Sequence, residues 1–180
     1  VLYIIMRITS YFFSKLPVFI PRLDYSKGLS VDVTTMIVVP TIIDDLEKVK
    51  EVFNTLETYY IANKTDHLYF SLLGSAGMHD NDLAIAEYGK KYAETLNKKY
   101  KKNIFFFVYC NQNLNDNKEK NAAFLHFNRY LLKKLNPKEK KKYYYLSTLD
   151  SLDEKIKYVI KLDPNMKSGL NTCLNLIGCM

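Results

Sequence analysis

Four short apolar runs, separated by longer segments of mixed polarity, constrain the fold of this chain more than any other feature. The runs cover residues 35–41, 67–73, 103–110 and 158–162. Continuous apolar runs of this length are typical of strands buried on both faces of a parallel sheet. Each run therefore predicts one strand of a central sheet.

The segments between these runs carry apolar side chains three or four residues apart, which is the spacing of one helix face. The first helix is expected to begin at Asp44 and Asp45, since acidic residues are favourable at a helix amino end. Alternating strands and helices predict an α/β fold, with an open, mostly parallel sheet and helices on both faces. The later helices are expected at 80–100, with Leu83, Tyr88, Tyr92 and Leu96 inward, at 122–135, and at 169–180 with Ser168 as cap.

Three stretches do not fit the alternation. Residues 111–120 are polar and rich in Asn, which predicts a loop. Residues 137–142 hold a run of lysines and predict a charged turn, while 143–155 show no clear period.

The ends of the predicted strands point to a site. The carboxyl ends of parallel strands share one edge of a sheet, where ligands of open α/β folds bind. That edge should bring together Pro40 and Thr41, Gly74 and Ser75, Cys110 and Asn111, and Asp163 to Asn165. Asp163 followed by Asn165 offers two oxygen donors of the kind that hard divalent cations prefer. Leu-Asp-Pro-Asn is equally typical of a strand end followed by a turn, so both interpretations stand.

The charge of the chain admits several anionic partners. Its net charge of +7 is compatible with nucleic acid, an anionic membrane or phosphorylated ligands. Many lysines, including the run 138–142, are expected to be solvated. Phe105–Phe107 fall in a predicted buried strand, so they cannot stack on bases, and no nucleic-acid partner is expected. The chain has three cysteines and three scattered histidines, and neither set has the spacing of metal ligands.

Residues 1–20 are apolar but carry Arg7 and Lys15. This composition predicts an amphipathic, membrane-proximal helix rather than a spanning one. The chain begins with Val, which suggests a piece of a longer protein. The expected organisation is therefore a segment 1–20 followed by one domain, 21–180.

Five stretches together resemble a known family. They are Pro21–Gly28, Thr35–Thr41, Leu56–Asn63, Leu68–Leu73 and Lys157–Asp163, and in this order and spacing they resemble the glycosyltransferase domain of cyclic β-1,2-glucan synthases. The resemblance implies the nucleotide-binding half of a GT-A type, Rossmann-like domain. It also implies UDP-glucose as donor, a growing glucan as acceptor, and Mg²⁺ or Mn²⁺ as cofactor. The implied location is the cytoplasmic face of the bacterial inner membrane, within a larger protein whose flanking segments contact the membrane.

The resemblance assigns roles to individual residues. Pro40 and Thr41 match the strand end that meets the nucleotide, and Asp163 matches the first metal-associated Asp. Asn165 stands where a second Asp is expected. Gly74 and Ser75 stand where the family has Thr-Asp, so Ser75 would line the nucleotide site. A basic, Gly-containing stretch of the family corresponds to 120–123, Lys-Asn-Ala-Ala, which has lost much of its positive charge.

Two functions follow from this comparison of motifs. The chain is expected to be a glycosyltransferase fragment that is inactive alone, because the acceptor half and the catalytic base would follow Asn165 and only fifteen residues do. The alternative is a degenerate, non-catalytic scaffold or interaction domain of a larger envelope protein. No residue is assigned as the catalytic base.

Overall fold

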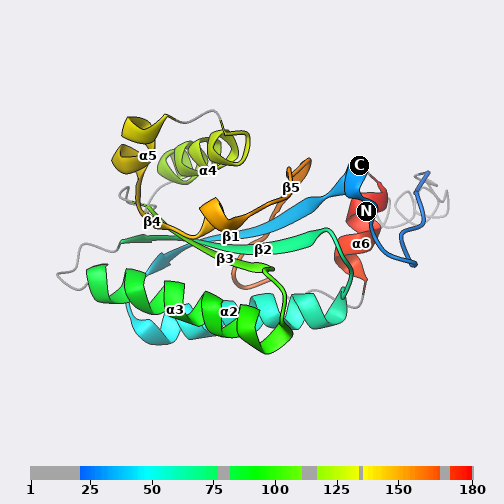
Figure 1. Ribbon diagram of the computed structural model, residues 1–180, viewed down its shortest axis with the longest axis horizontal. Coiled ribbons are helices and arrows are strands. Elements are labelled where there is room, and N and C mark those ends of the chain that lie inside the picture. Colours follow the sequence, from blue (N-terminus) through cyan, green and yellow to red (C-terminus); the bar gives the residue numbers. More distant parts are fainter. Residues whose placement is uncertain (1–20, 77–81, 111–116, 134–135, 167–170, 180) are drawn as a thin grey trace, which may run out of the picture.

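The computed structural model describes residues 21–76, 82–110, 117–133, 136–166 and 171–179, and Figure 1 shows how their elements are arranged. The predicted amphipathic segment 1–20 lies outside this part. The described elements are η1 (Val31–Val33), β1 (Thr35–Ile43), α2 (Leu46–Ala62), β2 (Leu68–Ala76), α3 (Asp82–Tyr100), β3 (Phe105–Cys110), α4 (Asn117–Leu131), α5 (Pro137–Tyr143), β4 (Tyr144–Ser147), η2 (Leu149–Ser151), β5 (Tyr158–Lys161) and α6 (Thr172–Gly178).

A five-stranded sheet, in the order β4-β3-β2-β1-β5, forms the centre of the molecule. β1, β2, β3 and β5 are parallel, and β4 runs antiparallel to β3 at one edge. The predicted open, mostly parallel, Rossmann-like sheet is therefore confirmed, with one strand more than the four apolar runs indicated.

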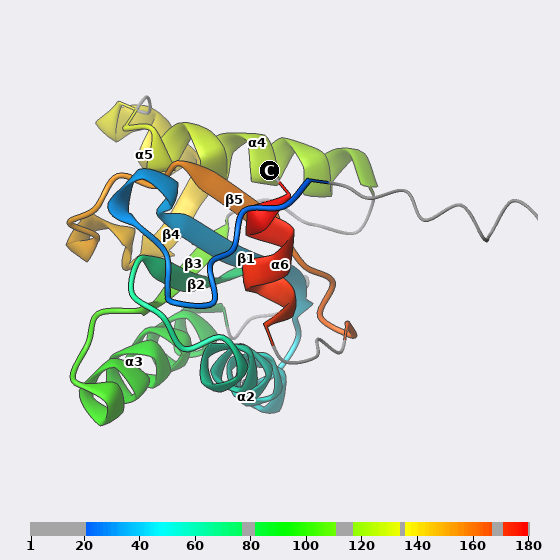
Figure 2. The same ribbon diagram turned by 90° about the vertical axis from the view of Figure 1, so that its right-hand side faces the viewer.

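Helices cover both faces of the sheet, as predicted. α2 and α3 lie against one face, while α4 and α5 lie over the other (Figure 1). Turning the molecule shows the short α6 beside the β1–β5 side of the sheet (Figure 2). Its buried Cys173, Leu174 and Ile177 join the core on the α2 side.

Side chains alternate between the two cores along each strand. On β1, Ile37 and Val39 belong to the core under α2 and α3, whereas Met36 and Val38 belong to the core under α4. β3 is buried along its whole length, which explains its uninterrupted Phe-Phe-Phe-Val-Tyr-Cys sequence. Phe105–Phe107 are fully buried, so these rings are closed to any stacking partner.

The charged stretch after α4 is a helix rather than the predicted turn. The Asn136 side chain accepts a hydrogen bond from the Glu139 N–H at 2.8 Å, and the Glu139 carboxylate accepts one from the Asn136 N–H at 3.1 Å. This reciprocal pair, with Pro137 in the first turn, starts α5. The helix leads directly into β4, which falls in the stretch 143–155 that has no clear period.

Three smaller predictions need correction. Leu83 is 58% exposed, because the inward face of α3 consists of residues such as Ile85, Ala86 and Leu96. Helix α4 begins at Asn117, so the predicted loop 111–120 is helical in its last part. Helix α6 begins at Thr172, after Asn171 in a left-handed conformation, rather than at 169. The cap proposed at Ser168 lies outside the described residues.

Candidate functional site at the carboxyl edge of the sheet

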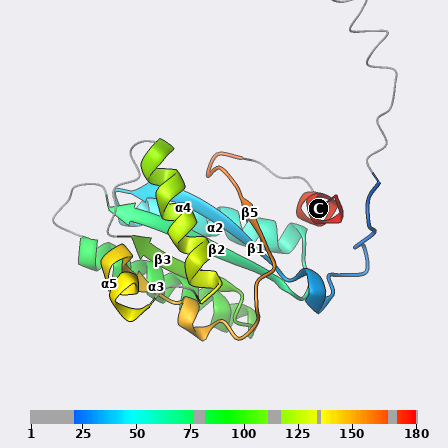
Figure 3. The ribbon, with the colours of Figure 1, turned by 90° about the horizontal axis from the view of Figure 1, so that it is seen from above.

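The pairing register brings the predicted site residues to one edge. Thr41 pairs with Gly74 and Ile42 with Ser75, while Ser75 pairs in turn with Cys110. Figure 3 shows that β1 and β2 end at the same side of the sheet. On the other side of β1, the Leu162 N–H donates to the Val38 carbonyl at 2.9 Å. Pro40, Thr41, Ser75 and Asp163 therefore come from three neighbouring strand ends, as the sequence predicted.

The two hydroxyl groups at this edge lie on opposite faces of the sheet. Thr41 alternates with Val39 and Ile43, which belong to the core under α2 and α3. Ser75 follows Leu73 on the face covered by α4. Both residues are buried, and the Ser75 Oγ has no hydrogen-bond partner among the described residues.

The thiol of the residue that pairs with Ser75 from the next strand, β3, is unreactive near neutral pH. Cys110, which ends β3, is 2% exposed. Burial raises the pKa of its thiol to about 12, so it is protonated near neutral pH. Because the thiolate is the nucleophilic form, Cys110 fits packing rather than covalent chemistry.

Asp163 and Asn165 lie together in an exposed turn. The Asp163 Oδ1 accepts a hydrogen bond from the Asn165 N–H at 2.9 Å, and the Met166 N–H donates to the Asp163 carbonyl at 3.0 Å. The turn interpretation of this sequence is therefore right about the conformation. It does not exclude a ligand, because an ionised carboxylate has further acceptor positions.

Helix α2 holds this turn in place. The Tyr59 hydroxyl donates a hydrogen bond to the Met166 carbonyl. Burial, followed by the nearby Cys173 thiol and Asp163 carboxylate, raises the pKa of Tyr59, so the phenol remains protonated and able to donate. The next turn of α2 contributes Asn63, whose Oδ1 accepts from the Cys173 N–H at 3.1 Å. The turn and the start of α6 are thus both tied to α2.

The donor set of the turn suits a divalent cation only in part. Asp163 supplies a carboxylate and Asn165 an amide oxygen, both hard donors. Within the described ranges, no group of three His, Cys, Asp or Glu side chains is placed to hold a metal ion. The two residues could therefore contribute to a metal site in which phosphate and water oxygens complete the shell.

Lys161 is a cation at this edge that sequence reasoning did not select. It precedes Asp163 by two residues, and its Nζ lies 5.8 Å from the centre of the Phe124 ring of α4. Its side chain is exposed and stands on the α4 side of the sheet, as Val159 does. The period of two along β5 could have indicated this position. Lys118 and Lys120, at the start of α4, have side chains outside the described part.

A second polar cluster, also missed from the sequence, lies at the opposite edge. His67 Nδ1 and Glu154 Oε2 are 2.8 Å apart, in a cavity of about 380 Å³ at the amino ends of β2 and β3. Burial, and then the Glu154 carboxylate, raise the pKa of Tyr69 beside them. His67 has a left-handed backbone, with φ of 62°. This cluster ties the segment before β5 to the start of β2.

Helices long and apolar enough to cross a membrane are absent from the part of the chain that the structure describes. This finding leaves the predicted role of residues 1–20 untested.

Comparison with known proteins gives one informative similarity. No family model matches the chain. The chain is 24% identical over 169 residues to the cyclic beta-(1,2)-glucan synthase NdvB of Rhizobium meliloti (strain 1021). That alignment covers 86% of this chain but 6% of the synthase. The similarity suggests a distant relationship to one small part of a much longer enzyme.

Proposed function

We propose that the carboxyl edge of this sheet binds a nucleotide sugar, and that the chain is the donor-binding half of a glycosyltransferase domain. The observation that carries the proposal is the convergence of Pro40, Thr41, Ser75 and Asp163 from three adjacent strand ends. The distant similarity to a glucan synthase supports the same activity. UDP-glucose, the donor that the family resemblance implies, is the ligand to test.

Asp163 would be the main protein contact to the diphosphate, acting through a divalent cation. A bound Mg²⁺ or Mn²⁺ would offset the phosphate charge, which is the chemistry that such an ion supplies to nucleotide sugars. Asn165 would add a neutral oxygen, so this ion would be held more weakly than between two carboxylates. Lys161 would contribute positive charge near the phosphates, because it stands two residues before Asp163 on an adjacent part of the edge.

The amino end of α4 would favour the same ligand. α4 begins soon after β3, so it starts near the carboxyl edge. Backbone N–H groups in the first turn of a helix attract anions such as phosphate. The base and sugar would lie along the backbone of β1 and β2, where Thr41 and Ser75 are buried. Transfer to a glucan acceptor, in a membrane-associated parent protein, belongs to the same proposal.

Calorimetric titration with UDP-glucose, with and without Mn²⁺, tests this function. Metal-dependent binding is expected, and Asp163→Ala should weaken it by more than the roughly tenfold that loss of an outer-shell group causes. Asp153→Ala is the matched control, because Asp153 is exposed and lies beside the cavity at the amino ends of the strands. Asn165→Asp should strengthen binding by adding the missing charge.

Equal affinity of the Asp163→Ala variant and the unchanged chain would refute the proposed role of Asp163. Absence of binding by a chain that circular dichroism shows to be folded would instead favour the degenerate scaffold. The observation that supports this alternative is that Asp163 is the one carboxylate of the proposed site, since metal ions on diphosphates are usually held by more than one carboxylate.

A further inference from the structure

The positive charge of this protein is concentrated in one layer. Residues 117–147 hold nine Lys or Arg and two Glu, a net charge of +7 that equals the net charge of the whole chain. This stretch forms α4, α5 and β4, so both helices over one face of the sheet belong to it (Figure 1). The remainder of the chain, including the layer of α2 and α3, is neutral in sum.

Two ion pairs among the described residues involve this layer. Arg129 pairs with Glu139 at 3.3 Å, and Lys140 pairs with Asp150 of η2. Four further lysines of the layer are exposed. The surplus follows from the count of charges, because Glu139 is the one acidic residue whose side chain the structure describes between 117 and 147. These lysines are Lys133, Lys138, Lys141 and Lys142.

The same stretch of chain carries exposed apolar side chains. Leu125 of α4 is 59% exposed and Leu132, just beyond the helix, is 48% exposed. They are seven residues apart, and the Leu132 N–H still donates to the Asn128 carbonyl at 3.0 Å, so both occupy one side of the helix. Ala123 and Phe127, on the other side, pack against the sheet. Leu125 therefore faces away from the sheet, and Leu132, about half exposed, also borders a cavity that α4 forms with Asp150 and Leu152.

We propose that this basic face, defined by Leu125, Leu132, Lys133, Lys138, Lys141 and Lys142, docks on an anionic phospholipid membrane. Lysines beside exposed leucines are what an interfacial helix presents to lipid, with the cations at the headgroups and the apolar side chains below them. The inference does not depend on the proposed nucleotide-sugar site, which lies at the edge of the sheet.

The composition of the face favours lipid over nucleic acid. Nucleic-acid surfaces combine Arg with aromatic rings that stack on bases. Here Arg129 is the one Arg of the layer and is paired with Glu139, and the three Phe of β3 are buried. The uncovered apolar groups among the described residues of α4 are aliphatic, which suits insertion among acyl chains.

Tryptophan reporters can locate the contact, because the chain has no Trp of its own. Leu125→Trp places a reporter on the basic face. Ile61→Trp is its matched control, because Ile61 is 62% exposed and lies on α2, across the sheet. With vesicles of phosphatidylcholine and phosphatidylglycerol, Leu125→Trp should show blue-shifted emission and quenching by brominated acyl chains. Ile61→Trp should show neither effect, and this difference between the two reporters is expected even if residues 1–20 bind the vesicles.

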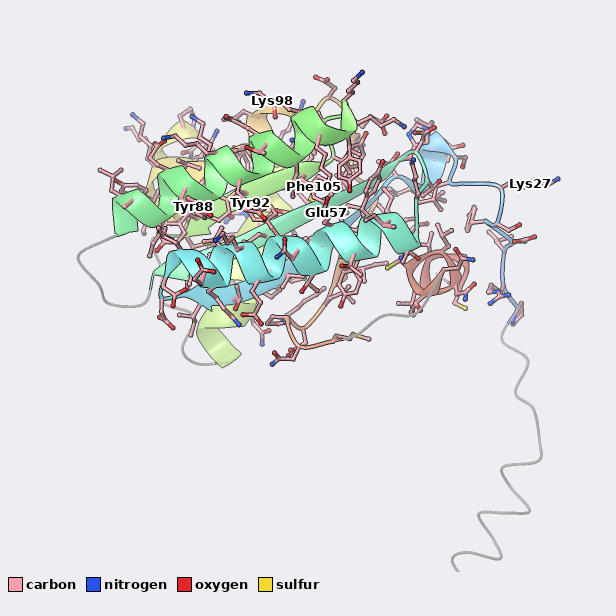
Figure 4. The ribbon with its side chains drawn as sticks, turned by 90° about the horizontal axis from the view of Figure 1, so that it is seen from below. Lys27, Glu57, Tyr88, Tyr92, Lys98 and Phe105 are labelled. Carbon is pink, nitrogen blue, oxygen red and sulfur yellow. The ribbon has the colours of Figure 1, made fainter. Side chains whose placement is uncertain are left out.

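Charge removal tests the electrostatic half of the proposal by vesicle sedimentation. The triple variant Lys138→Gln, Lys141→Gln, Lys142→Gln should bind anionic vesicles about a hundredfold more weakly, because each Lys near such a surface contributes about fivefold. The control triple, Lys64→Gln, Lys91→Gln, Lys98→Gln, removes the same charge elsewhere and should have a much smaller effect. All three control residues are exposed, and Lys98 points away from the sheet on α3 (Figure 4).

Three outcomes would overturn the proposal. One is equal blue shifts at positions 61 and 125, and another is an equal loss of vesicle binding in the two lysine triples. The third is tight, salt-sensitive binding of duplex DNA that the basic-face triple abolishes, with no binding to vesicles; this would assign the face to nucleic acid.

Discussion

Replacing Gly89 by alanine should destabilise this protein, although alanine is the better helix former. Gly89 lies in α3, where its backbone approaches β3. A Cβ atom at this position would lie 2.4 Å from Phe107 Cζ and 2.6 Å from each of the two Cε atoms of that ring. Contacts this short force the helix or the ring to move.

The Phe107 ring has little freedom to move. It is fully buried, with its centre 6.2 Å from that of Phe53 and 6.0 Å from that of Tyr109. Extra volume in a packed core typically costs about 1–3 kcal/mol. Alanine returns about 1 kcal/mol through its helix propensity. Because the contacts are so short, the upper part of the packing range applies, and the net loss should be about 2 kcal/mol.

Urea unfolding followed by circular dichroism measures this loss directly. A loss of about 2 kcal/mol should also lower the melting temperature by roughly 4–8 °C in a chain of this size. Lys91→Ala, at an exposed position of the same helix, should change the free energy of unfolding by less than about 0.5 kcal/mol. Adding Phe107→Leu to Gly89→Ala should cost less than the sum of the two single changes, since the smaller side chain relieves the contact. A Gly89→Ala variant more stable than the unchanged chain would refute the proposed contact.

Two further predictions concern polar groups that join the helices. Glu57 of α2 lies between α2 and α3 (Figure 4), and its carboxylate accepts hydrogen bonds of 2.6 Å from both Lys99 and Tyr100. Burial opposes ionisation, but these bonds and the Lys99 charge hold the pKa of Glu57 below its usual value. A carboxyl group whose pKa is lowered by folding stabilises the fold at pH values above its pKa in the unfolded chain. This stabilisation is lost as the pH falls through its pKa in the folded protein. Glu57→Gln should therefore cost about 1 kcal/mol near pH 7 and less near pH 3, as measured by urea unfolding at both; a cost independent of pH would contradict this. Asn63→Ala should cost about 1–3 kcal/mol, because the Cys173 N–H loses its bond to a 1% exposed side chain. Hydrogen exchange should then increase in α6 before it increases in β1, and uniform protection would show that Asn63 does not anchor this helix.

Most of the sheet could be predicted from the sequence because the strands and helices differ in period. The apolar run at Thr35–Thr41 is typical of a buried strand. Asp45 caps α2, as its acidic side chain predicted, and accepts from the Lys48 N–H at 2.7 Å. The segment 137–147 was harder, because α5 has no buried residue and therefore no apolar period. Its helix is determined by the Asn136–Glu139 capping pair, a signal of two side chains within a run of lysines.

The candidate site was predictable at the level of the edge but not of its side chains. Strand ends in a parallel sheet meet by geometry, which is why Thr41, Gly74 and Ser75 lie side by side. The support of the Asp163 turn by Tyr59 joins residues far apart in the chain, and no local pattern encodes such a contact. The pairing of His67 with Glu154 could not be predicted either, because these residues are also far apart in the chain.

The position of β5 has a consequence for how this protein folds. β5 is a four-residue strand at the edge of the sheet, and its pairing of Thr35 with Tyr158 closes a loop that spans most of the described chain. Contacts between such distant residues carry the largest closure entropy and tend to form late in folding. Short edge strands are also among the first parts of a sheet to open in local unfolding. The turn that holds Asp163 is therefore expected to form late and to open early, so occupancy of the proposed site would be coupled to the late steps of folding.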